Sequence, residues 1–270
     1  MVVQHNLRAM NSNRMLGLTA TTQSKSTEKL SSGYKINRAA DDAAGLAISE
    51  KMRRQIRGLT QASANAQDGI SMVQTAEGAL NEVHDMLQRI NELAVKGANG
   101  TLTSSDRSYI NLEVQQLMSE IDRVASTTTF NEQSLLTGSV TAGWDLQVGA
   151  EASQTINLKI NAMKCSAIGL AGSATSVSAS NALNTNVKAA IAAVNEQRAT
   201  LGAVQNRLEH TINNLDNVVE NTTAAESAIR DTDMATEMVR FSNNNVLTQA
   251  GQAMLAQANQ ANQGVLSLLQ

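Results

Sequence analysis

The feature that most constrains the fold is a seven-residue repeat of apolar positions that runs through most of the chain. Between residues 59 and 94 every seventh residue is Leu, Ala or Val, and several of them are followed three residues later by another apolar residue. The same spacing returns over residues 110–124 and 187–229. Such a repeat forms one narrow apolar stripe along an α-helix, which is buried only against other helices. The sequence therefore predicts long helices packed side by side.

Composition agrees with long helices. Proline, which ends or kinks helices, is absent from all 270 residues. A helix over about residues 44–97 would be roughly 80 Å long at 1.5 Å per residue. The glycine-rich break at 97–101 allows the next helix to fold back on it, with Thr103, Ser104 or Ser105 as candidate cap.

Two further patterns lie between the second and third stripes. Two-residue alternation over 144–148 and 155–160 predicts a β-hairpin at about 142–162. The small polar residues of 169–186 predict a loop. The expected fold class is mainly α: an elongated antiparallel helical bundle, or rod, over 45–239 that carries the hairpin, together with a terminal two-helix coiled coil.

Both ends of the chain carry apolar stripes with little charge around them. Such faces are poorly solvated, so neighbouring molecules are expected to cover them. We interpret residues 1–32 and 240–270 as a terminal coiled-coil domain that is completed by self-assembly. The expected self-assembly residues are Val3, Leu7, Met10, Leu247, Met254, Ala258, Val265 and Leu268.

The segment LSSGYKINRAADDAAGLAIS, residues 30–49, separates the first terminal stripe from the rod. Gly33 can adopt the left-handed conformation that ends a helix. Asn37, Asp41 or Asp42 can accept hydrogen bonds from the free N–H groups that start the next helix, and Arg38 is close enough in sequence to pair with either aspartate. Residues 33–44 are therefore predicted to form a joint.

No pattern indicates catalysis, a metal or a cofactor. The three histidines are isolated on helical segments, and none of the motifs HExxH, CxxC, P-loop or GxGxxG occurs. The single Cys165 cannot form an internal disulfide. We expect a protein that is not an enzyme and needs no cofactor.

Charge and hydropathy indicate neither nucleic acid nor a membrane as partner. The formal net charge is −3, and no segment approaches the roughly twenty apolar residues of a membrane span. The first residues lack the pattern of a cleaved secretory signal. The protein is expected either to stay in the cytoplasm or to leave it by a route without signal cleavage.

The segment 30–49 resembles the N-terminal signature of bacterial flagellins, the subunits of the flagellar filament. The similarity continues through NAQDGISMVQTAEGALNEVHDMLQRINELAVKGANGTLTSSDR, resumes as LGAVQNRLEHTINNL and AAESAIRDTDMATEM, and ends with QAGQAMLAQANQANQGVLSLLQ. It covers essentially the whole chain. The sequence departs from the family at Asn262, where many relatives have proline, and residues 126–180 are too short for large variable outer domains.

The resemblance implies a helical homopolymer, the extracellular flagellar filament. The terminal helices would form its inner tube, and the rod would pack around that tube. It also implies export through the flagellar type III apparatus, an export chaperone that holds the C-terminal segment, and contacts with filament cap and hook-junction proteins.

The resemblance further implies recognition by vertebrate Toll-like receptor 5, whose motif residues match Arg89, Leu93 and Glu113. These residues are equally interpretable as rod surface and packing residues. Two alternatives to a filament subunit stay open at this point: a hook-filament junction protein of the same family, and a cytoplasmic coiled-coil adaptor.

Overall fold

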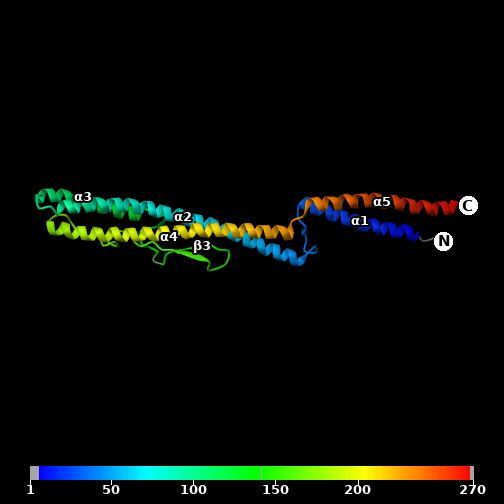
Figure 1. Cartoon of the computed structure of the whole chain (residues 1–270), viewed down its shortest axis with the longest axis horizontal. Coiled ribbons are helices and arrows are strands. Elements are labelled where there is room, and N and C mark those ends of the chain that lie inside the picture. The colour runs from blue at the N-terminus through cyan, green and yellow to red at the C-terminus, as the bar shows by residue number, and fades with distance from the viewer. Residues whose placement is uncertain (1–5, 141, 268–270) are drawn as a thin grey trace. The chain divides into compact units, whose positions relative to one another are not determined.

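The structure is a computed structural model that describes residues 6–140 and 142–267, with the side chains of 261–267 left out of the description. Its described part is mainly α-helical, as the sequence predicts (Figure 1). The helices are α1 (Leu7–Ser32), α2 (Ala43–Gly97), α3 (Ser104–Thr127), α4 (Val177–Arg230) and α5 (Met234–Ser267). Short strands lie between α3 and α4: β1 (Thr129–Phe130), β2 (Gln133–Ser134), β3 (Trp144–Gln147) and β4 (Thr155–Leu158).

The chain forms two compact units, each described here by itself. One contains the described parts of Met1–Ile56 and Glu220–Gln270, and the other contains Arg57–Val219. Helices α2 and α4 contribute residues to both units. None of the described helices combines the length and the apolar character needed to cross a membrane.

The unit Arg57–Val219 is a rod of α2, α3 and α4 with the strands at its side (Figure 1). The seven-residue repeats form its core, because the α2 residues from Leu59 to Ala94 and the α4 residues from Val187 to Leu215 on these repeats are all buried. Helix α4 runs antiparallel to α2: Ser63 bonds to Asp216 near one end, and Gly97 contacts Ser180 near the other. The predicted helical bundle is confirmed.

The start of α3 is fixed by one of the predicted caps. The Thr103 hydroxyl accepts the Asp106 N–H at 3.2 Å, and the Asp106 carboxylate accepts the Thr103 N–H at 3.0 Å. This reciprocal pair satisfies two N–H groups that a helix start leaves without partners. It lets α3 begin directly after the turn that follows α2.

The predicted β-hairpin is confirmed as β3 and β4, which pair antiparallel with Trp144 opposite Leu158. Two glycines of α2 allow it to approach closely. A Cβ at Gly69 would lie 2.5 Å from Leu146 Cδ1, and one at Gly58 would lie 2.9 Å from Ala150 Cβ. The hairpin therefore packs directly on the α2 backbone.

The predicted loop at 169–186 is wrong for its second half. Helix α4 already begins at Val177, after Ser176 accepts the Ala179 N–H with its hydroxyl at 3.1 Å. Small polar side chains hide the helical pattern there, yet Leu183 continues the apolar ladder and is fully buried. The two-residue strands β1 and β2 were also not predicted, because they are too short to show an alternation.

Candidate assembly surfaces

Helices α1 and α5 lie side by side and antiparallel (Figure 1). Asn6 at the start of α1 donates from Nδ2 to the Ala258 carbonyl near the end of α5, at 3.1 Å. At the other end Ser26 donates its hydroxyl proton to Glu237. The ends of α1 are capped by the Asn6 side chain and by Gly33, whose φ of 77° is the left-handed conformation expected for it.

The inward face of this pair mixes polar side chains with apolar ones. The less exposed residues recur at alternating spacings of three and four, as in a coiled coil: Ala9, Ser12, Leu16, Thr19, Gln23, Ser26 and Leu30 on α1, and Glu237, Phe241, Asn244, Thr248, Gly251, Leu255 and Ala258 on α5. We call these residues the polar seam. Across it the Thr248 hydroxyl donates to Gln23 Oε1 at 3.2 Å, and Gly251 lets Leu16 approach.

The polar seam is only partly satisfied. Asn244 Nδ2 is buried and has no hydrogen-bond partner among the described residues. Glu237 is 6% exposed, with Ser26 and, at 3.5 Å, Arg240 as its partners. Buried polar groups specify a pairing register while adding little stability, so the seam aligns the two helices more than it holds them together.

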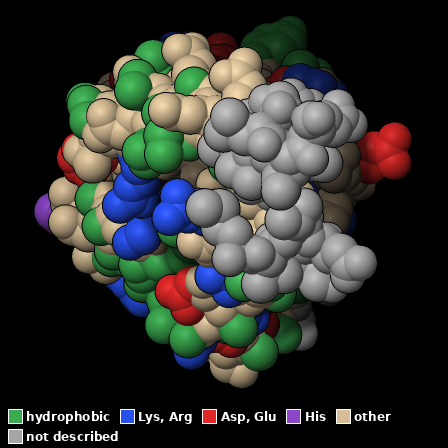
Figure 2. Space-filling view, turned by 90° about the vertical axis from the view of Figure 1, so that its right-hand side faces the viewer, with side chains coloured by type: hydrophobic (Ala, Val, Ile, Leu, Met, Phe, Trp, Pro, Cys, Tyr) green, Lys and Arg blue, Asp and Glu red, His purple; other side chains and the backbone are tan. Residues whose placement is uncertain are grey.

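The outward face of the pair carries the large apolar side chains. They are exposed by between 54% and 68%. Figure 2 views the molecule from the side where the chain termini lie and shows hydrophobic side chains among polar ones at the surface. We call this set the outer apolar face: Leu7, Met10, Met15 and Leu18 on α1, and Met238, Val239, Val246, Leu247 and Met254 on α5. A two-helix coiled coil that is complete in water buries its large apolar residues inside and carries charged residues outside.

The structure divides the expected self-assembly residues between the two faces. Leu7, Met10, Leu247 and Met254 belong to the outer apolar face, whereas Ala258 faces α1 in the polar seam. Val3, Leu268 and the side chain of Val265 lie outside the described residues.

The expected joint residues are brought together next to α1. The Asp41 carboxylate accepts the N–H groups of Arg38 and Asn37, and these bonds, the one from Arg38 above all, lower its pKa. Asp42 accepts the Gly45 N–H in the first turn of α2 at 2.9 Å.

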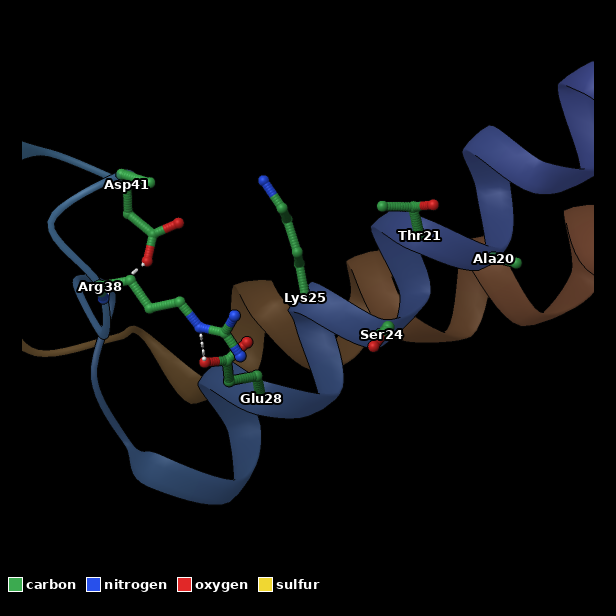
Figure 3. Close-up of a pocket in the computed structure, with 8 residues that line it drawn as sticks. Ala20, Thr21, Ser24, Lys25, Glu28, Arg38 and Asp41 are labelled. Carbon is green, nitrogen blue, oxygen red and sulfur yellow. Dashed lines mark hydrogen bonds and ion pairs between the residues drawn. The ribbon is translucent and has the colours of Figure 1, made fainter.

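The expectation that Arg38 pairs with Asp41 or Asp42 is wrong for its side chain. The Arg38 guanidinium bonds to Glu28 of α1 at 2.9 Å, whereas Asp41 accepts the backbone N–H of Arg38 (Figure 3). Both side chains line a pocket beside α1 with Thr21, Ser24 and Lys25.

The connection between α4 and α5 meets the connection between α1 and α2 at a two-residue bridge. The Lys35 N–H donates to the Arg230 carbonyl at 2.7 Å, and the Thr232 N–H donates to the Gly33 carbonyl at 2.9 Å. The Arg230 guanidinium lies 4.8 Å from the centre of the Tyr34 ring and 2.7 Å from Glu50. We call this arrangement the backbone bridge; no sequence pattern predicted it.

Two of the three expected receptor residues meet on the rod surface. Arg89 of α2 bonds to Glu113 of α3 at 2.9 Å and to Glu92 at 3.0 Å. The hydrogen bonds to Glu113 and Glu92 raise the Arg89 pKa above its usual range. Leu93 is 3% exposed, so it belongs to the rod core.

Three exposed apolar side chains on α2 and α3 were not predicted from the sequence. Val95 on α2 and Tyr109 and Leu112 on α3 are exposed by 55%, 75% and 63%. They lie outside the heptad stripes, which is the only signal that the sequence offers for them.

No group of three or more metal-binding side chains occurs among residues 6–140 and 142–267. Cys165 is buried beside α3, where its N–H bonds to Asp122 at 2.8 Å. Burial, with the Asp122 charge as a second cause, raises the pKa of this thiol to about 12.

Comparison with known families decides the identity. Residues 3–141 match the model of the bacterial flagellin N-terminal helical region, and residues 184–269 match that of the C-terminal helical region. The chain belongs to the flagellin family. This family is structural, so the expectation that the protein is not an enzyme is confirmed.

Full-length flagellins resemble the chain over its whole length. It is 55% identical to the flagellin of Halalkalibacterium halodurans and 51% identical to the flagellar filament 31.3 kDa core protein of Treponema maltophilum, in each case over 100% of both chains. Among solved structures, the crystal structure of Bacillus cereus flagellin matches with a TM-score of 0.52 and 32% identity, covering 56% of this chain and 88% of that one.

Proposed function

We propose that this flagellin is the subunit of an extracellular flagellar filament and that it assembles through the outer apolar face of α1 and α5. The observation that carries the proposal is the set of large apolar side chains exposed on the outward face of this pair, while many of the side chains where the two helices meet are polar. Apolar surface of this kind is stabilised when another molecule covers it. The names of the Treponema and Halalkalibacterium relatives support a second copy of the chain as that molecule.

Apolar burial is large enough to drive assembly. Fully burying one Leu or Met side chain contributes about 1.5–3 kcal/mol. The outer apolar face offers several such side chains on each of its two helices. Even partial burial against neighbours therefore offsets the loss of translational and rotational freedom on association.

Within this proposal, residues 1–32 and 240–270 form the inner tube, 45–239 form the surrounding rod, and 33–44 form the joint between them. Export follows the flagellar type III route without signal cleavage. An export chaperone covers the C-terminal segment before assembly, a role that the exposed Leu247 and Met254 support. Filament cap and hook-junction proteins contact the ends of the polymer.

Polymerisation of purified protein tests the proposal. The variant with Leu247→Lys and Met254→Lys replaces two residues of the outer apolar face and leaves the polar seam unchanged. We expect its critical concentration to rise at least about tenfold, which corresponds to roughly 1.4 kcal/mol of lost contact energy. Sedimentation and electron microscopy measure the polymer, and circular dichroism verifies that the helices form.

The matched control carries Gln252→Lys and Gln257→Lys, which add the same charge at exposed polar positions of α5. Its critical concentration should change much less. Equal effects of the two variants would contradict assembly through the outer apolar face. Long tubes of uniform width from the parent protein would separate a filament subunit from a hook-filament junction protein and from a cytoplasmic adaptor.

We also propose recognition of the rod by Toll-like receptor 5 at Arg89 and Glu113. The exposed ion pair and the exposed apolar side chains of Val95, Tyr109 and Leu112 on the same two helices support this second role. Leu93 would act by packing beneath the surface. Arg89→Ala should weaken binding of monomer to the receptor ectodomain, whereas Arg123→Ala, which removes a comparable exposed Arg–Glu pair on α3, should not. Equal affinities of both variants and the parent would contradict the site.

A further inference from the structure

The turn between α2 and α3 contains the only Asn-Gly pair in the sequence, Asn99-Gly100. We infer that this turn is a self-modifying site, in which the peptide nitrogen of Gly100 attacks the side-chain amide carbon of Asn99 and the asparagine is deamidated. Asparagine is among the chemically labile residues of proteins. The inference rests on how the turn holds the nucleophile, the electrophile and a cation, and it is independent of the proposed function.

The nucleophile is the N–H group of Gly100. It makes no hydrogen bond to any other residue that the structure describes, and both Asn99 and Gly100 are exposed. Glycine has no Cβ to obstruct ring closure. The comparable Asp68-Gly69 pair lies inside α2, where the helix holds the Gly69 N–H in a hydrogen bond.

The cation is Arg107 in the first turns of α3. Its Nη2 donates to the Asn99 carbonyl oxygen at 2.9 Å, and its Nε donates to the Gly97 carbonyl oxygen at 3.1 Å. The Asn99 carbonyl belongs to the same peptide group as the Gly100 nitrogen. When that nitrogen loses its proton, the negative charge is shared with this oxygen, and the guanidinium stabilises it.

The electrophile is the side-chain amide of Asn99, whose Oδ1 accepts the Thr101 N–H at 3.3 Å. An asparagine that bonds to the backbone two residues ahead folds its side chain back over the intervening amide, here that of Gly100. The Thr101 N–H also donates to the oxygen that becomes negative as the tetrahedral intermediate forms. Arg107 and Thr101 thus stabilise the two oxygens on which charge develops.

The reaction is balanced without any oxidant or reductant. The bond from Gly100 N to Asn99 Cγ forms, the Cγ–Nδ2 bond breaks, and ammonia leaves with the proton that the Gly100 nitrogen gave up. One water molecule then opens the resulting cyclic imide. Breaking the bond between N and Cγ gives aspartate, and breaking the backbone C–N bond gives isoaspartate.

Either product changes the turn. A neutral amide becomes a carboxylate, so the formal net charge falls from −3 by one unit to −4. Isoaspartate also inserts a methylene into the backbone between α2 and α3. That insertion displaces the Asn99 carbonyl from Arg107, which otherwise links this turn to α3.

The test follows deamidation at Asn99 in the folded full chain by peptide mass spectrometry and by enzymatic methylation of isoaspartate. We expect Asn99 to react faster than it does in a linear peptide of residues 96–104, and faster as the pH rises. Arg107→Gln should slow the reaction about tenfold, which corresponds to the loss of one charge-assisted hydrogen bond. Arg123→Gln is the matched control and should react at the parent rate.

Arg107→Gln also removes the hydrogen bond from Arg107 to the Gly97 carbonyl, so a second variant is needed that leaves Arg107 unchanged. A Cβ at position 100 meets nothing within 4 Å, so Gly100→Ala keeps the turn while it obstructs ring closure, and deamidation should slow. The proposal is overturned if folded protein reacts no faster than the peptide. It is equally overturned if Arg107→Gln reacts at the parent rate with its helices intact.

Discussion

Individual side chains differ sharply in what they contribute to the rod, even when they are chemically identical. Leu87 is fully buried in the core, whereas Leu112, on the neighbouring helix, is 63% exposed. Deleting buried methylene groups removes transfer free energy and leaves a cavity. Deleting exposed ones does neither.

Leu87→Ala should therefore lower the free energy of unfolding by about 3 kcal/mol. Leu112→Ala, the same chemical change at the surface, should change it by no more than about 0.5 kcal/mol. Urea denaturation followed by circular dichroism measures both values. A similar loss in the two variants would mean that the core assignment is wrong.

Cys165 should resist alkylation in the folded protein. Its pKa is raised to about 12 because the thiol is buried, so at pH 8 almost none of it is the reactive thiolate. Iodoacetamide should modify it slowly in buffer and readily in urea, where its pKa returns to the ordinary value. Equal rates in the two conditions, followed by mass spectrometry, would show that the thiol is accessible.

At the scale of elements, sequence periodicity predicted those elements that bury a regular row of apolar residues. The ladder from Leu59 to Ala94 and its continuation in α4 gave the rod, and alternation gave the hairpin. For α1 and α5 the sequence predicted that the two helices pair, but it did not predict which of their faces meet. Leu247 and Met254 of the apolar rhythm lie on the outward face, whereas Gly251 and Ala258 of the same rhythm lie where the two helices meet.

The reciprocal cap of α3 offers a test of an element boundary. Thr103→Ala removes the hydroxyl that accepts the Asp106 N–H and should destabilise the start of α3 by about 1 kcal/mol. Thr101→Ala is the control, since Thr101 contributes its backbone N–H to the turn. Hydrogen exchange in the first turn of α3 should rise in the first variant alone.

The same cap predicts a direction for acid sensitivity. Hydrogen bonds from Thr103 lower the Asp106 pKa in the folded protein, so this carboxylate stabilises the fold above its unfolded-state pKa. The contribution is lost as the pH falls through the lowered folded-state value. In Thr103→Ala the largest cause of the shift is gone, so Asp106 should titrate at higher pH, as measured by NMR. An unchanged titration would contradict the cap.

At the scale of the whole molecule, the two units have different kinds of interior. The unit Arg57–Val219 buries Leu, Ile and Val from three helices, whereas α1 and α5 meet through the polar seam. Apolar burial is the main source of local stability, so the two units should differ in their opening free energies.

Hydrogen exchange of monomer should therefore show α1 and α5 exchanging much faster than the rod segments of α2 and α4. Brief trypsin digestion should cut first at exposed basic residues outside 57–219. In assembled polymer the terminal helices should become protected, because neighbours cover the outer apolar face. Equal protection of both units in the monomer would contradict the difference in their interiors.

The backbone bridge has a consequence for engineering. The Lys35 and Thr232 N–H groups bond the α1–α2 connection to the α4–α5 connection. The chain between these connections therefore starts and ends at the same place. The tip of the β3–β4 hairpin in this part of the chain is the exposed turn after Glu151, next to the contact of Ala150 with Gly58. A foreign domain inserted at that tip lengthens this part of the chain but leaves both bridged connections unchanged. The hairpin turn is therefore a suitable insertion site for a displayed domain.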